Sequence, residues 1–249
     1  MPIVKLIWDG NGLNDAIKHN NIIIIVDVLR FSSTAITAVN NGTTIIPSYT
    51  LSHAKTLSKK NGAMVSALSK YSLSPASFLK VPRNSEIILV STNGARYSRL
   101  SSNAQLVLVG ALLNAGAVAK HAYAISKQFG RDIAIVAAGE KKLVKKMGRN
   151  AFEESFADDK NKDWFCLEDF LGAGAIISGI AMEKTDEALY AQATFQKYKN
   201  KLLSIIRSAV SGRYLIDLKK ENDIEFCSQL NKYTIVPQMV QGKIKKLMI

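Results

Sequence analysis

The residues best suited to chemistry follow an apolar run in the segment Ile22 to Thr34, which reads IIIIVDVLRFSST. Asp27 comes directly after five β-branched residues, and Arg30 stands three positions later. Three hydroxyl residues follow, namely Ser32, Ser33 and Thr34. A guanidinium group binds phosphate or carboxylate through its planar fork, and a helix start offers backbone N–H groups to an anion. The pattern indicates an anion site, although an ordinary helix start with a surface arginine would use the same residues.

Further carboxylates stand where other apolar runs end or helices begin. Besides Asp27, they are Glu140, Glu168 and Asp169, and Gly139 directly precedes Glu140. Carboxylate oxygens suit Mg²⁺, which usually takes one or two protein carboxylates and keeps several waters. The alternative for Glu168 and Asp169 is that they only begin a helix, where negative charge is favoured. The residues alone thus predict an α/β protein with an anion site, and they are compatible with a Mg²⁺ site.

Several other chemistries lack the residues they need. The three histidines, His19, His53 and His121, stand far apart, which argues against a histidine base and a zinc cluster. The phosphate-loop, dinucleotide and serine-hydrolase motifs are absent from the sequence. Cys166 and Cys227 form no CxxC motif, so we expect each to be a small buried hydrophobe.

The elements that must position these residues alternate between strands and helices. Strands are predicted over Ile22–Val26, Thr43–Ile46, Ala63–Leu68, Glu86–Val90, Leu106–Gly110 and Asp132–Ala138, and helices over Ala35–Asn40, Leu51–Lys60, Ala115–Phe129 and Leu167–Ile180. One or two helices are expected over Glu183–Val210, and a helix followed by a strand over Asp223–Pro237. Continuous apolar strands with helices between them are typical of a parallel sheet, in which ligands bind at the carboxyl ends of the strands. The turn Ser91–Arg96 (STNGAR) follows the strand Glu86–Val90 and is a second junction between a strand and a polar turn, like the one that follows Ile22–Val26.

Length and composition indicate an ordinary globular chain. Its 249 residues, 47% of them apolar, are enough for a single domain over residues 1–249. No apolar stretch has the length of a membrane helix and the N-terminus does not resemble a signal peptide, so we expect a cytoplasmic protein. The charged segment from Lys141 to Lys162 could be an insertion or a flap. The net charge of +13 raises the question of nucleic acid, but the basic residues are scattered and few aromatics interleave, so no nucleic acid is expected.

Six motifs in order resemble the 2-phosphosulfolactate phosphatase family, also called ComB-like. They are VDVLRFSST (Val26 to Thr34), SLSPASF (Ser72 to Phe78), STNGAR (Ser91 to Arg96), GALLNAGAVA (Gly110 to Ala119), AAGE (Ala137 to Glu140) and LEDFLGAGAI (Leu167 to Ile176). A weaker similarity continues through Ser211-Gly212-Arg213, Asp223-Ile224 and Val236-Pro237. The resemblance covers most of the chain.

The resemblance implies a three-layer α/β/α fold with a largely parallel or mixed central sheet. It also implies a phosphoric monoester hydrolase that converts 2-phospho-3-sulfolactate to 3-sulfolactate and phosphate with Mg²⁺, a step of coenzyme M biosynthesis. Asp27 and Arg30 would be catalytic, and Asp27, Glu140, Glu168 and Asp169 would lie at the metal. The groups that bind the substrate phosphate would be Ser32, Ser33, Thr34, Thr92, Asn93, Gly94, Arg96 and Gly139. The implied partner is a small anionic phosphoester, there is no membrane partner, and a homodimer is compatible with this reading.

One segment departs from the family pattern. Typical members carry a GER segment followed by GFDxGNSP, whereas this chain reads ALSKYSLSPASF from Ala67 to Phe78. The glutamate, the arginine and the aspartate of that pattern are missing. This loss could change specificity, weaken metal binding or abolish hydrolysis, so the alternative function is a catalytically altered relative that binds a small phosphorylated or sulfonated ligand.

Overall fold

The structure, a computed structural model, describes residues 1–141 and 163–247. The expected insertion or flap from Lys141 to Lys162 lies outside the described residues, apart from Lys141. Among the described residues, no helix has both the length and the apolar character needed to cross a membrane.

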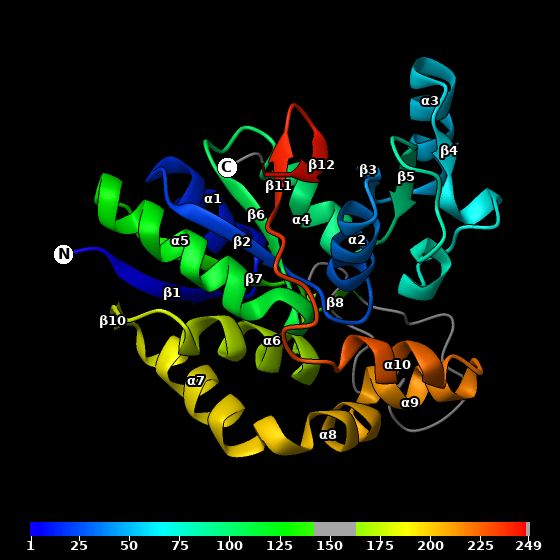
Figure 1. Cartoon of the computed structure of the whole chain (residues 1–249). Helices are drawn as coiled ribbons and strands as arrows, with labels where there is room; N and C mark the ends of the chain where they lie inside the picture. The colour runs from blue at the N-terminus through cyan, green and yellow to red at the C-terminus, as the bar shows by residue number, and fades with distance from the viewer. Residues whose placement is uncertain (142–162, 248–249) are drawn as a thin grey trace.

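Strands and helices alternate along most of the chain (Figure 1). The strands are β1 (Ile3–Ile7), β2 (Ile22–Val26), β3 (Thr44–Ser48), β4 (Met64–Val65), β5 (Glu86–Val90), β6 (Val107–Gly110), β7 (Ile133–Ala137), β8 (Glu140–Lys141), β9 (Asp163–Trp164), β10 (Glu183–Lys184), β11 (Pro237–Val240) and β12 (Lys243–Lys246). The helices are α1 (Gly10–Lys18), α2 (Phe31–Asn40), α3 (Leu51–Asn61), α4 (Gly94–Leu100), α5 (Ala115–Phe129), α6 (Leu167–Ser178), α7 (Asp186–Tyr198), α8 (Leu202–Ser208), α9 (Val210–Asp217) and α10 (Glu221–Cys227). Short 3-10 helices cover Ser66–Leu68, Pro75–Phe78, Leu112–Asn114 and Lys199–Lys201.

The central sheet joins two parallel blocks that run in opposite directions. Its strand order is β10-β1-β7-β2-β6-β11-β12-β3-β5-β4. The strands from β10 to β6 are parallel to one another, and so are β3, β5 and β4. The β11–β12 hairpin pairs antiparallel with β6 on one side and with β3 on the other. The prediction of an α/β fold with a largely parallel or mixed sheet is therefore confirmed.

Helices cover both faces of the β1–β7–β2–β6 block. The connections β1-α1-β2 and β6-α5-β7 cross the sheet in opposite directions, so right-handed crossovers place α1 and α5 on opposite faces. In Figure 1, α5 crosses in front of this block and α6 lies below α5, next to α7. Every residue of β2 and of β7 is buried, as expected for strands that are covered on both faces.

Small residues in α6 allow close packing against its neighbours. A Cβ added at Gly172 would lie 2.6 Å from a methyl carbon of Val28. A Cβ at Gly174 would lie 2.2 Å from the backbone oxygen of Ala191 in α7. Because glycine has no side chain at these two positions, α6 can pack tightly between the sheet and α7.

Several predicted boundaries were wrong. The sequence analysis did not predict β1 or α1, although the Asp9 carboxylate caps α1 by accepting a hydrogen bond from the N–H of Gly12 at 2.7 Å. The proposed strand Ala63–Leu68 forms only two strand residues, and the C-terminal strand is a hairpin that begins at Pro237. Pro47 does not end β3 but lies within it, opposite Leu89 of β5, while β12 pairs with β3 only at Ile45. A proline is tolerated there because β12 does not pair with that end of the strand.

Candidate functional site

The Asp27 carboxylate joins the two junctions that the sequence singled out. Its Oδ1 accepts a hydrogen bond from the N–H of Phe31 at 3.0 Å, and its Oδ2 accepts one from the N–H of Gly94 at 2.8 Å. Phe31 begins α2 and Gly94 begins α4, so each helix has one of its unpaired N–H groups satisfied by the same buried side chain. This explains why α2 begins at Phe31, four residues before the predicted start at Ala35. The carboxyl ends of β2 and β5 therefore meet, although their blocks run in opposite directions.

Two further carboxylates come from the first turn of α6. Asp169 accepts hydrogen bonds from the N–H of Val28 at 2.7 Å and from the N–H of Gly139 at 3.0 Å. It thereby ties the end of β2 to the end of β7. Glu168 is equally buried, and its Oε2 has no hydrogen-bond partner among the described residues.

Asp27, Glu168 and Asp169 form an electrostatically unfavourable group, which we call the carboxylate cluster. Burial raises the pKa of all three side chains. The negative charge of Asp27 further raises the pKa of Glu168 and of Asp169, so the three groups lie within range of one another. Hydrogen bonds from Gly94 and Phe31 and the positive charge of Arg30 act in the opposite direction on the pKa of Asp27. A bound cation would relieve this repulsion.

Arg30 does not face solvent as a free surface arginine. Its Nη1 donates to Oδ2 of Asp223, a residue of α10, and its side chain is only 16% exposed. The other oxygen of Asp223 accepts a hydrogen bond from the hydroxyl of Ser74. Arg30 thus lies beside Asp27, and its guanidinium is held by Asp223 from the C-terminal part of the chain.

The three hydroxyl residues at the start of α2 are fully buried. The hydroxyl groups of Ser32, Ser33 and Thr34 donate to the backbone oxygens of Ile25 (3.2 Å), Val28 (2.8 Å) and Leu73 (2.6 Å). The Ser32 hydroxyl also accepts from the N–H of Asp27 at 3.0 Å. In this structure, these side chains therefore fix the backbone around Asp27.

The predicted binding residues of the second junction differ in their surroundings. Thr92 is exposed and Asn93 is buried. The guanidinium of Arg96 lies over the ring of Tyr97, with its central carbon 4.5 Å from the ring centre. A Cβ added at Gly94 would lie 2.4 Å from the Phe31 ring and 2.8 Å from Oδ2 of Asp27, so only glycine allows the observed hydrogen bond.

Gly139 and Glu140 belong to a small antiparallel pairing next to the cluster. Gly139 has a φ of +59°, and an added Cβ would lie 2.2 Å from the backbone oxygen of Trp164. Glu140 pairs with Trp164 in the β8–β9 ladder. Its charge acts on the thiol of Cys166, which precedes α6, so it lies at the rim of the group formed by Glu168 and Asp169. Gly139 contacts the cluster through its backbone N–H group, which donates a hydrogen bond to Asp169.

The carboxylate cluster has donor atoms of the kind that a divalent cation binds, but the described residues form no preformed cage. Within residues 1–141 and 163–247, no three His, Cys, Asp or Glu side chains are arranged to hold a metal ion by themselves. Mg²⁺ needs only one or two carboxylates alongside water and a phosphate oxygen. The buried Glu168 Oε2 without a partner, next to two further carboxylates, is a donor set of that kind.

Sequence reasoning did not assign a role to three residues at this site. Asp223 accepts a hydrogen bond from Arg30, Ser74 donates to Asp223, and the nearby hydroxyl of Ser211 in α9 lowers the pKa of Glu168. All three residues lie in motifs named in the sequence analysis, but the sequence around each of them does not indicate which side chain it contacts. Their roles depend on the return of the C-terminal helices to the sheet.

Comparisons with known proteins identify a family for the chain. A sequence model of a protein family described as 2-phosphosulpholactate phosphatase matches residues 11–242. Probable 2-phosphosulfolactate phosphatases are among the similar proteins. The one from Symbiobacterium thermophilum is 27% identical over 89% of this chain and 92% of its own length. The one from Clostridium beijerinckii is 28% identical over 97% of this chain and 98% of its own length.

Proposed function

The chain belongs to the 2-phosphosulpholactate phosphatase family, and on this basis we propose that it hydrolyses 2-phospho-3-sulfolactate or a related small anionic phosphoester. The products would be 3-sulfolactate and phosphate, as in coenzyme M biosynthesis. The observation that carries the proposal is the buried carboxylate cluster beside Arg30, at the meeting point of two strand-to-helix junctions. The relatives' names supply the substrate class.

The substrate class explains why cationic groups are needed here. A phosphate joined to a carboxylate and a sulfonate carries several negative charges, and the carboxylate cluster would repel it. Arg30 has five N–H donors, and Asp223 occupies part of them. The remaining donors of Arg30 are proposed to bind the phosphate, and Arg96 is proposed to bind a second anionic group, with Thr92 and Asn93 at the same junction.

Mg²⁺ is the proposed cofactor. When bound, it would neutralise charge on the phosphate oxygens and lower the pKa of a bound water. Glu168, Asp27 and Asp169 would hold it, with Glu140 at the rim. Both oxygens of Asp27 and of Asp169 already accept backbone hydrogen bonds, which orient these side chains in advance.

In the proposed reaction, a water oxygen forms a bond to phosphorus and the bond from phosphorus to the lactate oxygen breaks. The water gives up a proton, and the leaving oxygen takes one up to become the hydroxyl of sulfolactate. Asp27 is proposed as the catalytic carboxylate because it is fixed by both junctions and lies beside Arg30. Positioning and charge neutralisation account for most catalysis of phosphoryl transfer.

The test is phosphate release from 2-phosphosulfolactate and a panel of small 2-phospho acids, with Mg²⁺ and with EDTA. We expect metal-dependent release by the wild type. Asp27→Ala should lower kcat by about 100-fold or more, because it removes a group at the reacting centre. The matched control Asp217→Ala, an exposed carboxylate at the end of α9, should retain wild-type activity.

Two other outcomes would redirect the proposal. Release that survives both EDTA and Asp27→Ala would place the chemistry elsewhere in the chain. No release from any compound, together with tight binding of inorganic phosphate or sulfolactate, would favour the ligand-binding relative, and the segment ALSKYSLSPASF would then be the first cause to examine.

A further inference from the structure

Asp223, a buried carboxylate of α10, contacts the site through Arg30. We propose that Asp223 is a positioning residue that holds the Arg30 guanidinium in the orientation that binds the substrate phosphate. This inference rests on the proposed function. It adds to that function a dependence of phosphate binding on the C-terminal helix and on the Ser72–Phe78 segment.

Each oxygen of Asp223 has a partner from a different part of the chain. Oδ2 accepts from Nη1 of Arg30, in the junction after β2, and Oδ1 accepts from the hydroxyl of Ser74, in the Ser72–Phe78 segment. The Asp223 side chain is only 4% exposed. Because water hardly reaches this carboxylate, its two partners determine where it lies, and in turn it determines where Arg30 lies.

Arg30 needs such a partner because of its own position. It is the residue directly before α2, and its side chain is long and has many rotamers. The guanidinium is planar, so a bond at one end fixes the direction of the remaining N–H groups. With Asp223 on Nη1, those groups are held for a second anion, and less entropy is lost when that anion binds.

The surroundings of Cys227 show that α10 lies within electrostatic range of the catalytic junction. Cys227 stands one turn after Asp223. The pKa of its thiol is raised to about 12, chiefly by burial and also by the negative charges of Asp223 and Asp27, while the nearby Ser33 hydroxyl and the positive charge of Arg30 act in the opposite direction. The Arg30–Asp223 pair is therefore part of the site and not a distant surface contact.

A purely structural ion pair would also be destabilising to break, because it would leave a buried charge without a partner. Stability alone therefore cannot test the proposal. The discriminating measurements are the affinity for inorganic phosphate and the separate values of KM and kcat, measured in the presence of Mg²⁺.

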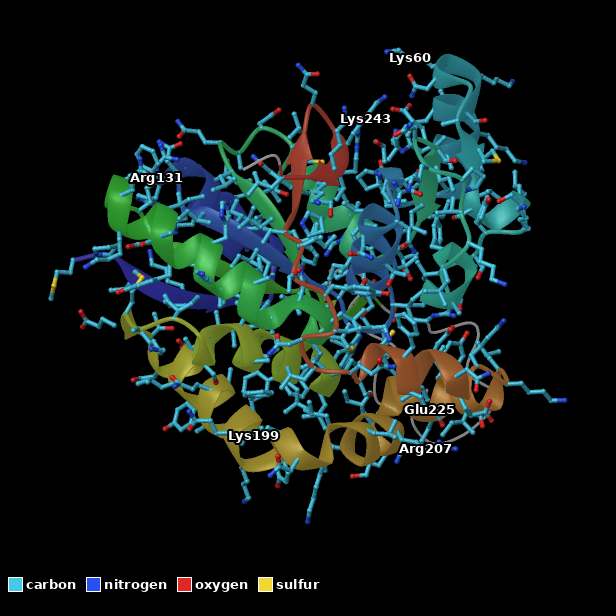
Figure 2. All side chains as sticks on the ribbon, viewed as in Figure 1. Lys60, Arg131, Lys199, Arg207, Glu225 and Lys243 are labelled. Atoms are coloured by element: carbon cyan, nitrogen blue, oxygen red, sulfur yellow. The ribbon has the colours of Figure 1, made fainter. Side chains whose placement is uncertain are left out.

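We would compare Asp223→Asn and Ser74→Ala with the control Glu225→Gln. Glu225 lies two residues further along α10, is exposed and lies 3.7 Å from Arg207 at the surface (Figure 2). Asp223→Asn should weaken phosphate binding and raise KM by about 10- to 100-fold, with a smaller change in kcat, because it removes orientation from a binding group. Ser74→Ala should act in the same direction but less strongly, and Glu225→Gln should leave all three quantities unchanged.

A double-mutant cycle with Arg30→Ala shows whether Asp223 acts through Arg30. In that background, Asp223→Asn should cause no further loss of phosphate affinity. A folded Asp223→Asn protein with wild-type phosphate affinity and KM would overturn the proposal, and so would tighter phosphate binding, which would mean that Asp223 competes with phosphate for Arg30. If Asp223→Asn does not fold, wild-type values for Ser74→Ala would overturn it. A wild type that neither hydrolyses the phosphoesters nor binds phosphate would refute the proposed function itself.

Discussion

At the scale of single residues, the site depends on side chains that organise the backbone before any ligand binds. Asp27 and Asp169 each accept two backbone N–H groups from different segments. Hydrogen bonds to charged acceptors are worth about 1.5–3 kcal/mol each, so these carboxylates hold the loops at the ends of β2, β5 and β7 together. The same contacts fix the carboxylates for chemistry.

Gly94→Ala should damage the site without touching a charged residue. The added methyl group would lie against the buried Phe31 ring and Oδ2 of Asp27, so the helix start must shift and the hydrogen bond to Asp27 lengthens. We expect a loss of about 1–3 kcal/mol in the free energy of unfolding and a fall in kcat/KM. Urea unfolding and phosphate release would measure the two effects.

The control for this substitution is Gly10→Ala, at the start of α1. A Cβ added at Gly10 meets no atom within 4 Å, so stability and activity should stay close to those of the wild type. If Gly94→Ala behaved like Gly10→Ala, the contact between the two junctions would be unimportant for the site.

At the scale of elements, strand pairing places the carboxyl ends that carry the site. The end of β7 lies beside the end of β2, where the N–H of Ala138 donates to the backbone oxygen of Val26 at 2.8 Å. At the opposite edge, Asp132 links β7 to β1: it accepts from the N–H of Ile3 at 2.9 Å and lies 2.7 Å from Nζ of Lys5. The Asp132 contacts thus connect β1 to β7 within the block that carries Asp27.

Asp132 should make stability depend on pH in the acid range. Burial alone would raise the pKa of Asp132, but hydrogen bonds from Lys5 and Ile3 and the charge of Lys5 lower it overall. A carboxylate with a lowered pKa stabilises the fold above its unfolded pKa of about 4, and the stabilisation disappears as the pH falls through the folded value. Asp132→Asn should therefore cost about 1 kcal/mol at neutral pH, and the difference from wild type should close in acid.

Urea unfolding of both proteins over a range of pH values would test this. Asp217→Asn is the control, because Asp217 is exposed at the end of a helix. A difference between Asp132→Asn and wild type that is independent of pH would show that the lost contact is not electrostatic.

At the scale of the whole molecule, the site depends on both blocks of the sheet. Asp27 and Asp169 belong to the β1–β7–β2–β6 block, whereas Gly94 follows β5 of the other block. The β11–β12 hairpin is the part of the sheet that joins the blocks, and Figure 1 shows it above α2. The blocks are therefore expected to unfold together, as one domain over the described residues.

Ile244→Ala should destabilise the whole molecule. Ile244 is fully buried in β12 and pairs with Ile45 of β3, so its truncation leaves a cavity where the blocks join. We expect a loss of about 2–5 kcal/mol in one cooperative transition, while Val240→Ala, at a 42% exposed position of β11, should change stability by about 0.5 kcal/mol or less. Calorimetry would separate the outcomes, because two transitions would mean that the blocks are independent domains.

Positive charges lie on several parts of the described chain. Figure 2 shows Lys60 and Lys243 towards the top of the view, Arg131 on the left and Lys199 at the bottom. One of them, Lys243, lies 2.6 Å from a carboxylate oxygen of Glu86. A net charge of +13 gives a general attraction for small anions.

The sequence by itself determined the fold class, most of the strands and helices, and the family. Burial and helix ends leave local patterns: the run Ile22–Val26 predicts a buried strand, and Asn61-Gly62 predicts the observed end of α3. The tertiary structure decided which side chains meet. Arg30 pairs with Asp223, 193 positions away, and Asp27 caps a helix that begins 67 positions later. Such pairings depend on strand order, on the opposite directions of the two blocks and on the return of α10, because they form between segments whose own sequences specify only their local shape.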